Sequence, residues 1–266
     1  MKKIILTALA VAFSLALFCP VRAADDASID KSTVDKGYFT IKYNGDFEKI
    51  IKLQVFVEGK EEKYNYDLTT NDPVTVPLQL GNGKYTVYVL RNVTGTSYTP
   101  LFMETFSADI KSPNEMFKIS NPYVNFSTGM EFFKGYSKVF APITDINAKV
   151  SSYYDEVVQK YSYDHDKLKN LPSGYVPVID KTYAAKKGIC SDYSTLLAGF
   201  LRGIGVPVKV VMGYAPEIKE YHAWNEIYIG GKWVTVDATY DSAYYLAGYK
   251  YSMVKDSSKF QVIKVY

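Results

Sequence analysis

The spacing of apolar residues changes near Ala141, and this change divides the chain into two parts with different folds. Before it, short runs of β-forming residues are separated by turn signals such as Asn71-Asp72-Pro73 and Gly81-Asn82-Gly83. After it, apolar residues recur every three or four positions, as on one face of a helix. We therefore predict an α+β protein, with a β-sandwich-like domain over residues 24–140 and a second domain over residues 141–266.

The first part contains five short candidate strands. They lie at residues 38–43, 52–57, 64–68, 74–78 and 85–90. Several short strands separated by turns are typical of a β-sandwich. The charged residues of this part show no arrangement typical of catalysis, so we predict a packing, spacing or binding role for it.

A helical pattern opens the second part, where one face is outlined by Ile143, Ile146, Val150, Tyr153, Val157 and Tyr161. Thr144 and Asp145 lie near the start of this helix and can cap it. A second helix is expected to begin near Cys190. A strand at 206–212 and a hairpin at 222–237 are expected to follow.

The net charge and the numbers of cysteines and histidines limit the classes of partner and cofactor that we expect. The chain has 31 Lys and Arg against 28 Asp and Glu, and its excess of three is matched by the three basic residues of segment 1–23, which has no acid. The remainder is neutral and lacks a basic run, which argues against nucleic acid or an anionic membrane as the main partner. With two cysteines and two histidines, we expect no disulfide scaffold, no metal site and no cofactor.

Residues 1–23 have the pattern of a secretory signal peptide. Lys2 and Lys3 precede an apolar run at 4–18 that is too short for a membrane anchor, and small residues favour cleavage after Ala23. The alternative is a lipoprotein modified at Cys19, which would follow Phe18 where a small residue is usual. We expect a secreted or cell-surface protein, which cleavage would leave with one cysteine.

That remaining cysteine, Cys190, lies in Lys187-Gly188-Ile189-Cys190-Ser191-Asp192-Tyr193 at the expected start of the second helix. A helix N-terminus favours the thiolate, which is the nucleophilic form, and its free N–H groups can stabilise an oxyanion. A lone thiol is unusual in an oxidising compartment. The alternative is a buried cysteine that serves only as a small hydrophobic residue.

The hairpin predicts a second feature of the site. If Gly230-Gly231 forms a two-residue turn, His222 faces Thr239 and Trp224 faces Asp237 across the ladder. His222 and Asp237 are then diagonal neighbours on one face, within reach of a hydrogen bond. Such an acid would hold the imidazole in one tautomer. The alternatives are that His222 is an ordinary surface or core histidine with its hydrogen bonds satisfied, and that Asp237 is a turn residue at the end of a strand.

Four sequence blocks together resemble the bacterial branch of the transglutaminase-like superfamily, over about residues 141–250. They are Gly188-Ile189-Cys190-Ser191-Asp192-Tyr193, Leu201-Arg202-Gly203-Ile204-Gly205-Val206-Pro207, Tyr221-His222-Ala223-Trp224-Asn225-Glu226 and Trp233-Val234-Thr235-Val236-Asp237-Ala238-Thr239. The resemblance implies a papain-like domain whose helix-borne cysteine packs on an antiparallel sheet. It also implies a catalytic triad at Cys190, His222 and Asp237.

The implied chemistry is acyl transfer on an amide of a protein or a cell-wall peptide. Cys190 would attack the carbonyl, His222 would protonate the leaving amine, and water or an amine would resolve the thioester. Transglutaminase, deamidase and cysteine protease reactions all remain open. So do two non-enzymatic roles, a module that binds cell-wall peptide or glycan and a structural surface protein. The oligomeric state is not predicted.

Four further side chains have expected places. Tyr183 is a candidate second oxyanion donor. Trp224 and Trp233 either wall an acyl tunnel or belong to the core, the commoner place for hairpin aromatics. His165 is expected in a surface loop.

Overall fold

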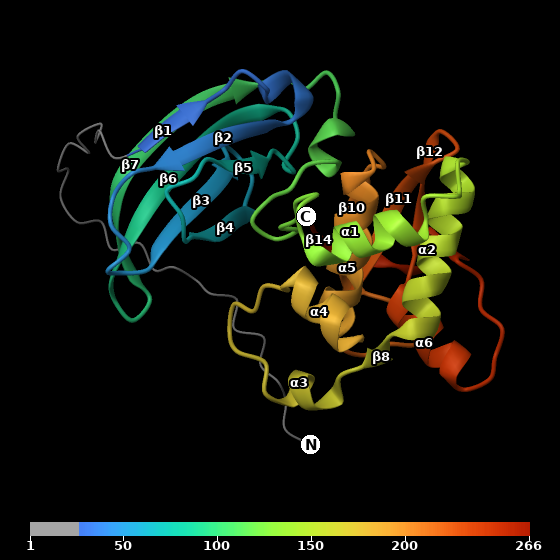
Figure 1. Cartoon of the computed structure of the whole chain (residues 1–266). Helices are drawn as coiled ribbons and strands as arrows, with labels where there is room; N and C mark the ends of the chain where they lie inside the picture. The colour runs from blue at the N-terminus through green and yellow to red at the C-terminus, as the bar shows by residue number, and fades with distance from the viewer. Residues whose placement is uncertain (1–26) are drawn as a thin grey trace. The chain divides into compact units, whose positions relative to one another are not determined.

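The computed structural model describes residues 27–266 (Figure 1). The predicted signal peptide, its cleavage site and Cys19 lie outside the described residues. The chain forms two compact units. The first comprises residues up to Ser32, Phe39–Val74 and Leu80–Asp109, and the second comprises Thr33–Tyr38, Thr75–Gln79 and Ile110–Tyr266. The fold class is α+β, as predicted.

The N-terminal region is built from strands. They are β1 (Ala27–Asp30), β2 (Tyr38–Tyr43), β3 (Ile51–Val57), β4 (Lys63–Leu68), β5 (Val74–Pro77), β6 (Gly83–Thr94) and β7 (Ser97–Ala108), with short 3-10 helices η1 (Val34–Lys36) and η2 (Glu115–Phe117). β1 pairs with β2, and β4-β3-β6-β7 form an antiparallel sheet in that order. All five predicted strands are present.

Period-two patterning explains the burial of these strands. In β4, Tyr64, Tyr66 and Leu68 are buried while the residues between them are exposed. Phe39 of β2 meets Phe106 of β7 edge to face, with ring centroids 5.5 Å apart. This contact is of the kind that joins two sheets, and the β-sandwich stays a prediction.

Segment 110–266 of the second unit holds six α-helices and seven strands. The helices are α1 (Glu131–Val139), α2 (Ile146–Lys160), α3 (His165–Lys169), α4 (Ile179–Ala185), α5 (Cys190–Gly203) and α6 (Ala238–Leu246). The strands are β8 (Ser162–Tyr163), β9 (Lys187–Gly188), β10 (Val208–Tyr214), β11 (His222–Ile229), β12 (Lys232–Val236), β13 (Val254–Lys255) and β14 (Gln261–Val265), with η3 at Ser257–Lys259.

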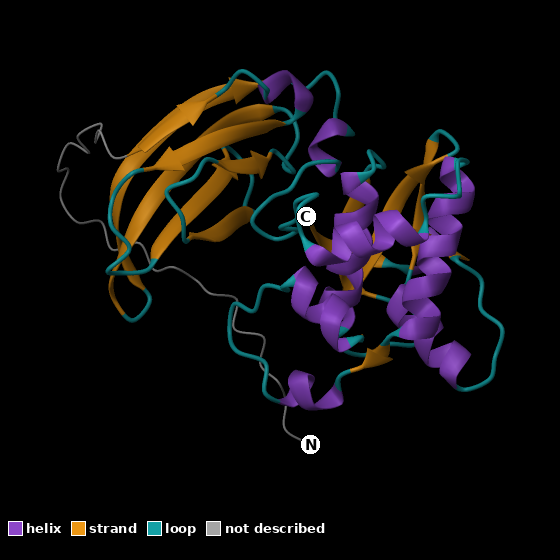
Figure 2. Ribbon diagram, in the orientation of Figure 1, coloured by secondary structure: helices purple, strands orange, loops and turns teal. Residues whose placement is uncertain are grey.

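One antiparallel sheet supports the second unit. Its strand order is β13-β12-β11-β10-β14, while β8 and β9 form a separate parallel pair. Figure 2 shows the helices of this unit gathered against the sheet, and α5 packs on β10 and β11. The helix that begins with Cys190 therefore lies on the strand that begins with His222.

Helix α5 forms the centre of the core. Every residue from Ser191 to Arg202 is buried, because helices and sheet surround it. On α1, Phe133 packs on Phe200 at a centroid distance of 5.5 Å. Helix α1 thus contacts α5 although it precedes residue 140, and the domain boundary that we place there stays a prediction.

Within residues 27–266, no helix has the length and apolar character that crossing a bilayer requires.

Candidate active site

Cys190 is the first residue of α5, and its side chain is partly exposed. The short strand β9 leads into it and pairs with β8, where Tyr163 stands opposite Gly188. A Cβ atom on Gly188 would lie 2.6 Å from the Cβ of Asp192. Only glycine therefore allows the chain to approach the helix this closely before the cysteine.

The hairpin has the predicted register. Ile229 pairs with Lys232 and Asn225 with Val236, and the turn glycines Gly230 and Gly231 have φ values of 58° and 78°. Positive φ at both turn positions is the two-residue geometry that glycine favours.

The prediction that Thr239 faces His222 across the hairpin is wrong. β12 ends at Val236, and Thr239 lies in α6. Asp237 is the N-cap of that helix, and its Oδ1 accepts a hydrogen bond of 3.0 Å from the backbone N–H of Tyr240. The helix cap, rather than the ladder, sets the direction of the Asp237 carboxylate.

His222 and Asp237 are in direct contact. His222 Nε2 lies 2.8 Å from Asp237 Oδ2, and the two side chains are only 6% and 2% exposed. Because Nε2 is engaged by the carboxylate, Nδ1 is the ring nitrogen left for Cys190, which lies close enough to raise the pKa of the imidazole. The structure thus brings all three predicted site residues together.

The electrostatics of this group favour a charged imidazole. Burial alone would lower the pKa of His222, but the charge and hydrogen bond of Asp237, with the hydrogen bond and charge of Cys190, raise it to about 10. The Asp237 carboxylate, buried beside the ring, stabilises the protonated imidazole.

A side chain that the sequence analysis did not single out joins the two halves of the site. Asn225 is 1% exposed, and its Nδ2 donates to the carbonyl oxygens of Ser194 in α5 and Lys209 in β10, both at 3.0 Å. The available signal was an amide directly after Ala223 and Trp224 in an expected strand. A buried amide needs such partners.

Tyr163 is a second residue that sequence reasoning missed. Burial, followed by electrostatic interaction with Cys190 and Asp192, raises the pKa of its hydroxyl, while a hydrogen bond from the backbone N–H of Cys190 lowers it. The hydroxyl therefore lies beside the nucleophile and keeps its proton at neutral pH. The pairing of β8 with β9 places it there, and spacing alone does not reveal it.

Tyr183 has a different environment from the one we expected. Its ring lies 5.1 Å from that of Tyr136, and the ammonium of Lys186 lies 4.0 Å from its centroid. His165 is exposed as expected, but it begins α3, with its ring centroid 5.0 Å from that of Tyr163.

The two tryptophans lie in different places. Trp224 is buried, with its ring 6.4 Å from that of His222 and 5.0 Å from that of Phe260. Trp233 instead packs against Tyr228 and Phe117.

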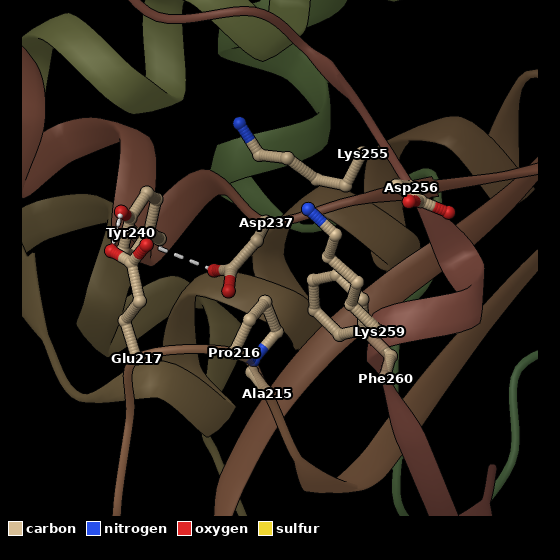
Figure 3. A pocket seen from close by; sticks show the side chains of 9 residues that line it. All are labelled: Ala215, Pro216, Glu217, Asp237, Tyr240, Lys255, Asp256, Lys259 and Phe260. Carbon is tan, nitrogen blue, oxygen red and sulfur yellow. Dashed lines mark hydrogen bonds between the residues drawn. The ribbon is translucent and has the colours of Figure 1, made fainter.

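A cavity of about 180 Å³ adjoins Asp237 (Figure 3). Pro216 and Phe260 give it apolar walls, and the Tyr240 hydroxyl donates to Glu217 Oε2 at 2.7 Å beside it. Cys190 and His222 do not line this cavity.

Comparison with known proteins identifies the class of domain that carries this site. Residues 136–238 match the family model described as the transglutaminase-like superfamily, and this range includes Cys190, His222 and Asp237. This part of the chain is similar to transglutaminase-like domains, in agreement with the resemblance of the sequence blocks. No curated protein matches the chain.

Similar solved structures include a proposed cysteine protease from Cytophaga hutchinsonii, 19% identical, which covers 82% of this chain and 72% of its own, with a TM-score of 0.46. A structure named as a TGase is 20% identical, with coverages of 60% and 46% and a TM-score of 0.36. Red sea bream transglutaminase is 11% identical, with coverages of 76% and 48% and a TM-score of 0.28. The chain spans less than half the length of the last two structures.

Proposed function

We propose that this chain is a secreted, thiol-dependent enzyme that transfers or hydrolyses acyl groups of peptide or protein amides. Cys190 is the nucleophile, His222 the acid and base, and Asp237 the group that orients His222. The observation that carries the proposal is the buried contact of 2.8 Å between His222 Nε2 and Asp237 Oδ2, with Cys190 close enough to raise the pKa of the same ring.

In the first step, the Cys190 sulfur forms a bond to the carbonyl carbon. The C–N bond then breaks, and the protonated His222 gives its proton to the leaving amine or ammonia. A thioester on Cys190 remains. Water or a primary amine then attacks it, His222 takes a proton from that nucleophile, and the thiolate is regenerated.

The oxyanion of the tetrahedral intermediate needs donors beside the sulfur. The backbone N–H of Cys190 is one, at the N-terminus of α5. We assign the Tyr163 hydroxyl as the second, because it lies beside Cys190 and keeps its proton at neutral pH. The substrate oxygen would replace this hydroxyl as the acceptor of the Cys190 N–H. Replacing Tyr163 by Phe should lower kcat with little change in KM.

Mass spectrometry of glutamine peptides and cell-wall peptides, incubated with the protein and a primary amine, tests the proposal. Amine incorporation with loss of ammonia defines a transglutaminase, deamidation defines an amidohydrolase, and backbone cleavage defines a protease. Cys190→Ala is the control that should form no product. If the folded wild type forms none of the three products from any peptide, the enzymatic proposal is wrong.

Export is tested separately. N-terminal sequencing of the protein from culture medium or cell surface should give Ala24 as the first residue. Lipid attached at Cys19 would instead support the lipoprotein alternative.

A further inference from the structure

The segment that follows Tyr163 is tied closely to the residues around Cys190. The N–H of Asp164 donates to the Gly188 carbonyl at 2.8 Å, and the Asp164 carboxylate lies 3.3 Å from the Lys187 ammonium. The same carboxylate caps α3 by accepting from the N–H of Lys167 at 2.9 Å. Helix α3 is therefore anchored beside the nucleophile.

Asp192 is the point where this segment meets α5. The carboxylate is fully buried, and its Oδ2 accepts from the backbone N–H of Ile189 at 2.8 Å and from Lys167 Nζ at 2.6 Å. Its Oδ1 accepts from the Tyr175 hydroxyl at 2.6 Å. The Lys167 ammonium also lies 4.6 Å from the centre of the Tyr175 ring. A buried carboxylate is stable only with such donors.

The position of Asp192 gives it two opposite effects on Cys190. Its bond to Ile189 fixes the residue before the nucleophile, which favours the reactive geometry. Its negative charge, two residues from the sulfur, opposes a thiolate and weakens the field of the helix N-terminus. A cation bound to the same carboxylate offsets its negative charge and leaves its hydrogen bond to Ile189 in place.

We propose that Lys167 and Tyr175 are positioning residues for Cys190 that act through Asp192. Lys167 offsets the charge of Asp192, and both residues hold its carboxylate against the Ile189 N–H. The inference rests on the proposed function, because it assigns Cys190 as a nucleophile that must ionise. The other titratable groups around the sulfur are His222 of β11, Tyr163 of β8 and Tyr123 from the loop before α1.

The rate of Cys190 alkylation by iodoacetamide, measured from pH 5 to 10 on the full chain, tests the proposal. The rate for Cys190→Ala is subtracted. We expect Lys167→Met to slow alkylation at neutral pH about tenfold and to move the midpoint of the profile up by about one pH unit, the scale on which one nearby charge acts. Lys167→Arg should restore most of the rate, because it keeps the charge.

Lys169→Met is the matched control. Lys169 lies in the same short helix but pairs with Asp166 at 3.6 Å, with both side chains more than 70% exposed. It should react like the wild type, and an equal loss in this variant would indicate a general surface-charge effect and overturn the proposal. Tyr175→Phe, which removes one hydrogen bond, should slow alkylation a few-fold, and it decides the question if Lys167→Met does not fold.

Wild-type rates and midpoints in both Lys167→Met and Tyr175→Phe would overturn the inference. If these variants behave as expected while no peptide is ever turned over, the positioning role stands and the proposed function fails. The two failures are therefore distinguishable.

Discussion

The side-chain amide nitrogen of Asn225 lies 3.0 Å from the carbonyl oxygen of Ser194, and this bond joins the strand that bears His222 to the helix that bears Cys190. The same nitrogen also reaches Lys209 on the neighbouring strand. One amide therefore fixes the nucleophile helix against two strands of the sheet.

Replacing Asn225 by Ala should weaken both stability and chemistry. It removes two hydrogen bonds from the buried side-chain amide to backbone carbonyls, which costs about 1–3 kcal/mol in the free energy of unfolding. Urea denaturation gives that value, and iodoacetamide alkylation reports the loss of Cys190 reactivity. The matched control is Asn92→Ala, whose amide also serves two carbonyls, at 2.9 and 3.3 Å, but in an exposed hairpin. Equal reactivity in the two variants would contradict the role given to Asn225.

The role of Asp237 in orienting His222 can be separated from its role as the N-cap of α6. Asn is also a good N-cap, so Asp237→Asn should keep α6 while removing the charge and the correct tautomer of His222. We expect kcat to fall by about 10⁴, with a melting temperature close to that of the wild type. Asp237→Ala should lose the cap as well, at a cost of about 1 kcal/mol. Full activity of Asp237→Asn would show that this carboxylate has no part in the reaction.

The raised pKa of His222 links folding stability to pH. The ordinary value is 6.5 and the folded value about 10, with Asp237 and Cys190 supplying the increase. The folded state therefore binds the proton more tightly, and the resulting stabilisation is complete below about pH 6.5 and is lost as the pH rises through about 10. The difference in unfolding free energy between wild type and His222→Gln, measured in urea across this range, should shrink with rising pH. A constant difference would rule out an ion pair between protonated His222 and Asp237.

Gly188→Ala should displace the start of α5. The added Cβ would lie 2.6 Å from the Cβ of Asp192, an atom close to the backbone that cannot move aside. We expect slower alkylation of Cys190 and a lower melting temperature. Gly129→Ala is the control, because the nearest atom to its Cβ would be 3.7 Å away. If Gly188→Ala kept wild-type reactivity, the approach of β9 to α5 would not matter for the site.

The hairpin register could be predicted because Gly230-Gly231 fixes both the length and the geometry of its turn. The end of β12 could not be predicted, because an aspartate at position 237 is equally compatible with the end of a strand and with the N-cap of a helix. Strand β7 was missed because Pro100 interrupts its pattern. In the structure the strand tolerates Pro100 next to a break in register with β6, at the sheet edge.

The meeting of Cys190 with His222 depends on contacts between distant parts of the chain. Asn225 and Arg202 supply these contacts. The Arg202 guanidinium donates to three backbone carbonyls, those of Val208 at 2.8 Å, Ile119 at 3.1 Å and Tyr266 at 2.8 Å. Nothing in local spacing encodes these partners. Tyr163 was missed for the same reason, since only the pairing of two very short strands brings it to the nucleophile.

Asp237 holds the first turn of α6 with one oxygen and the imidazole with the other. Fraying at this terminus would therefore free the ring to rotate while the rest of the protein stays folded. Substitutions that loosen α6, even far from the sulfur, should reduce turnover at temperatures well below the point where the protein melts.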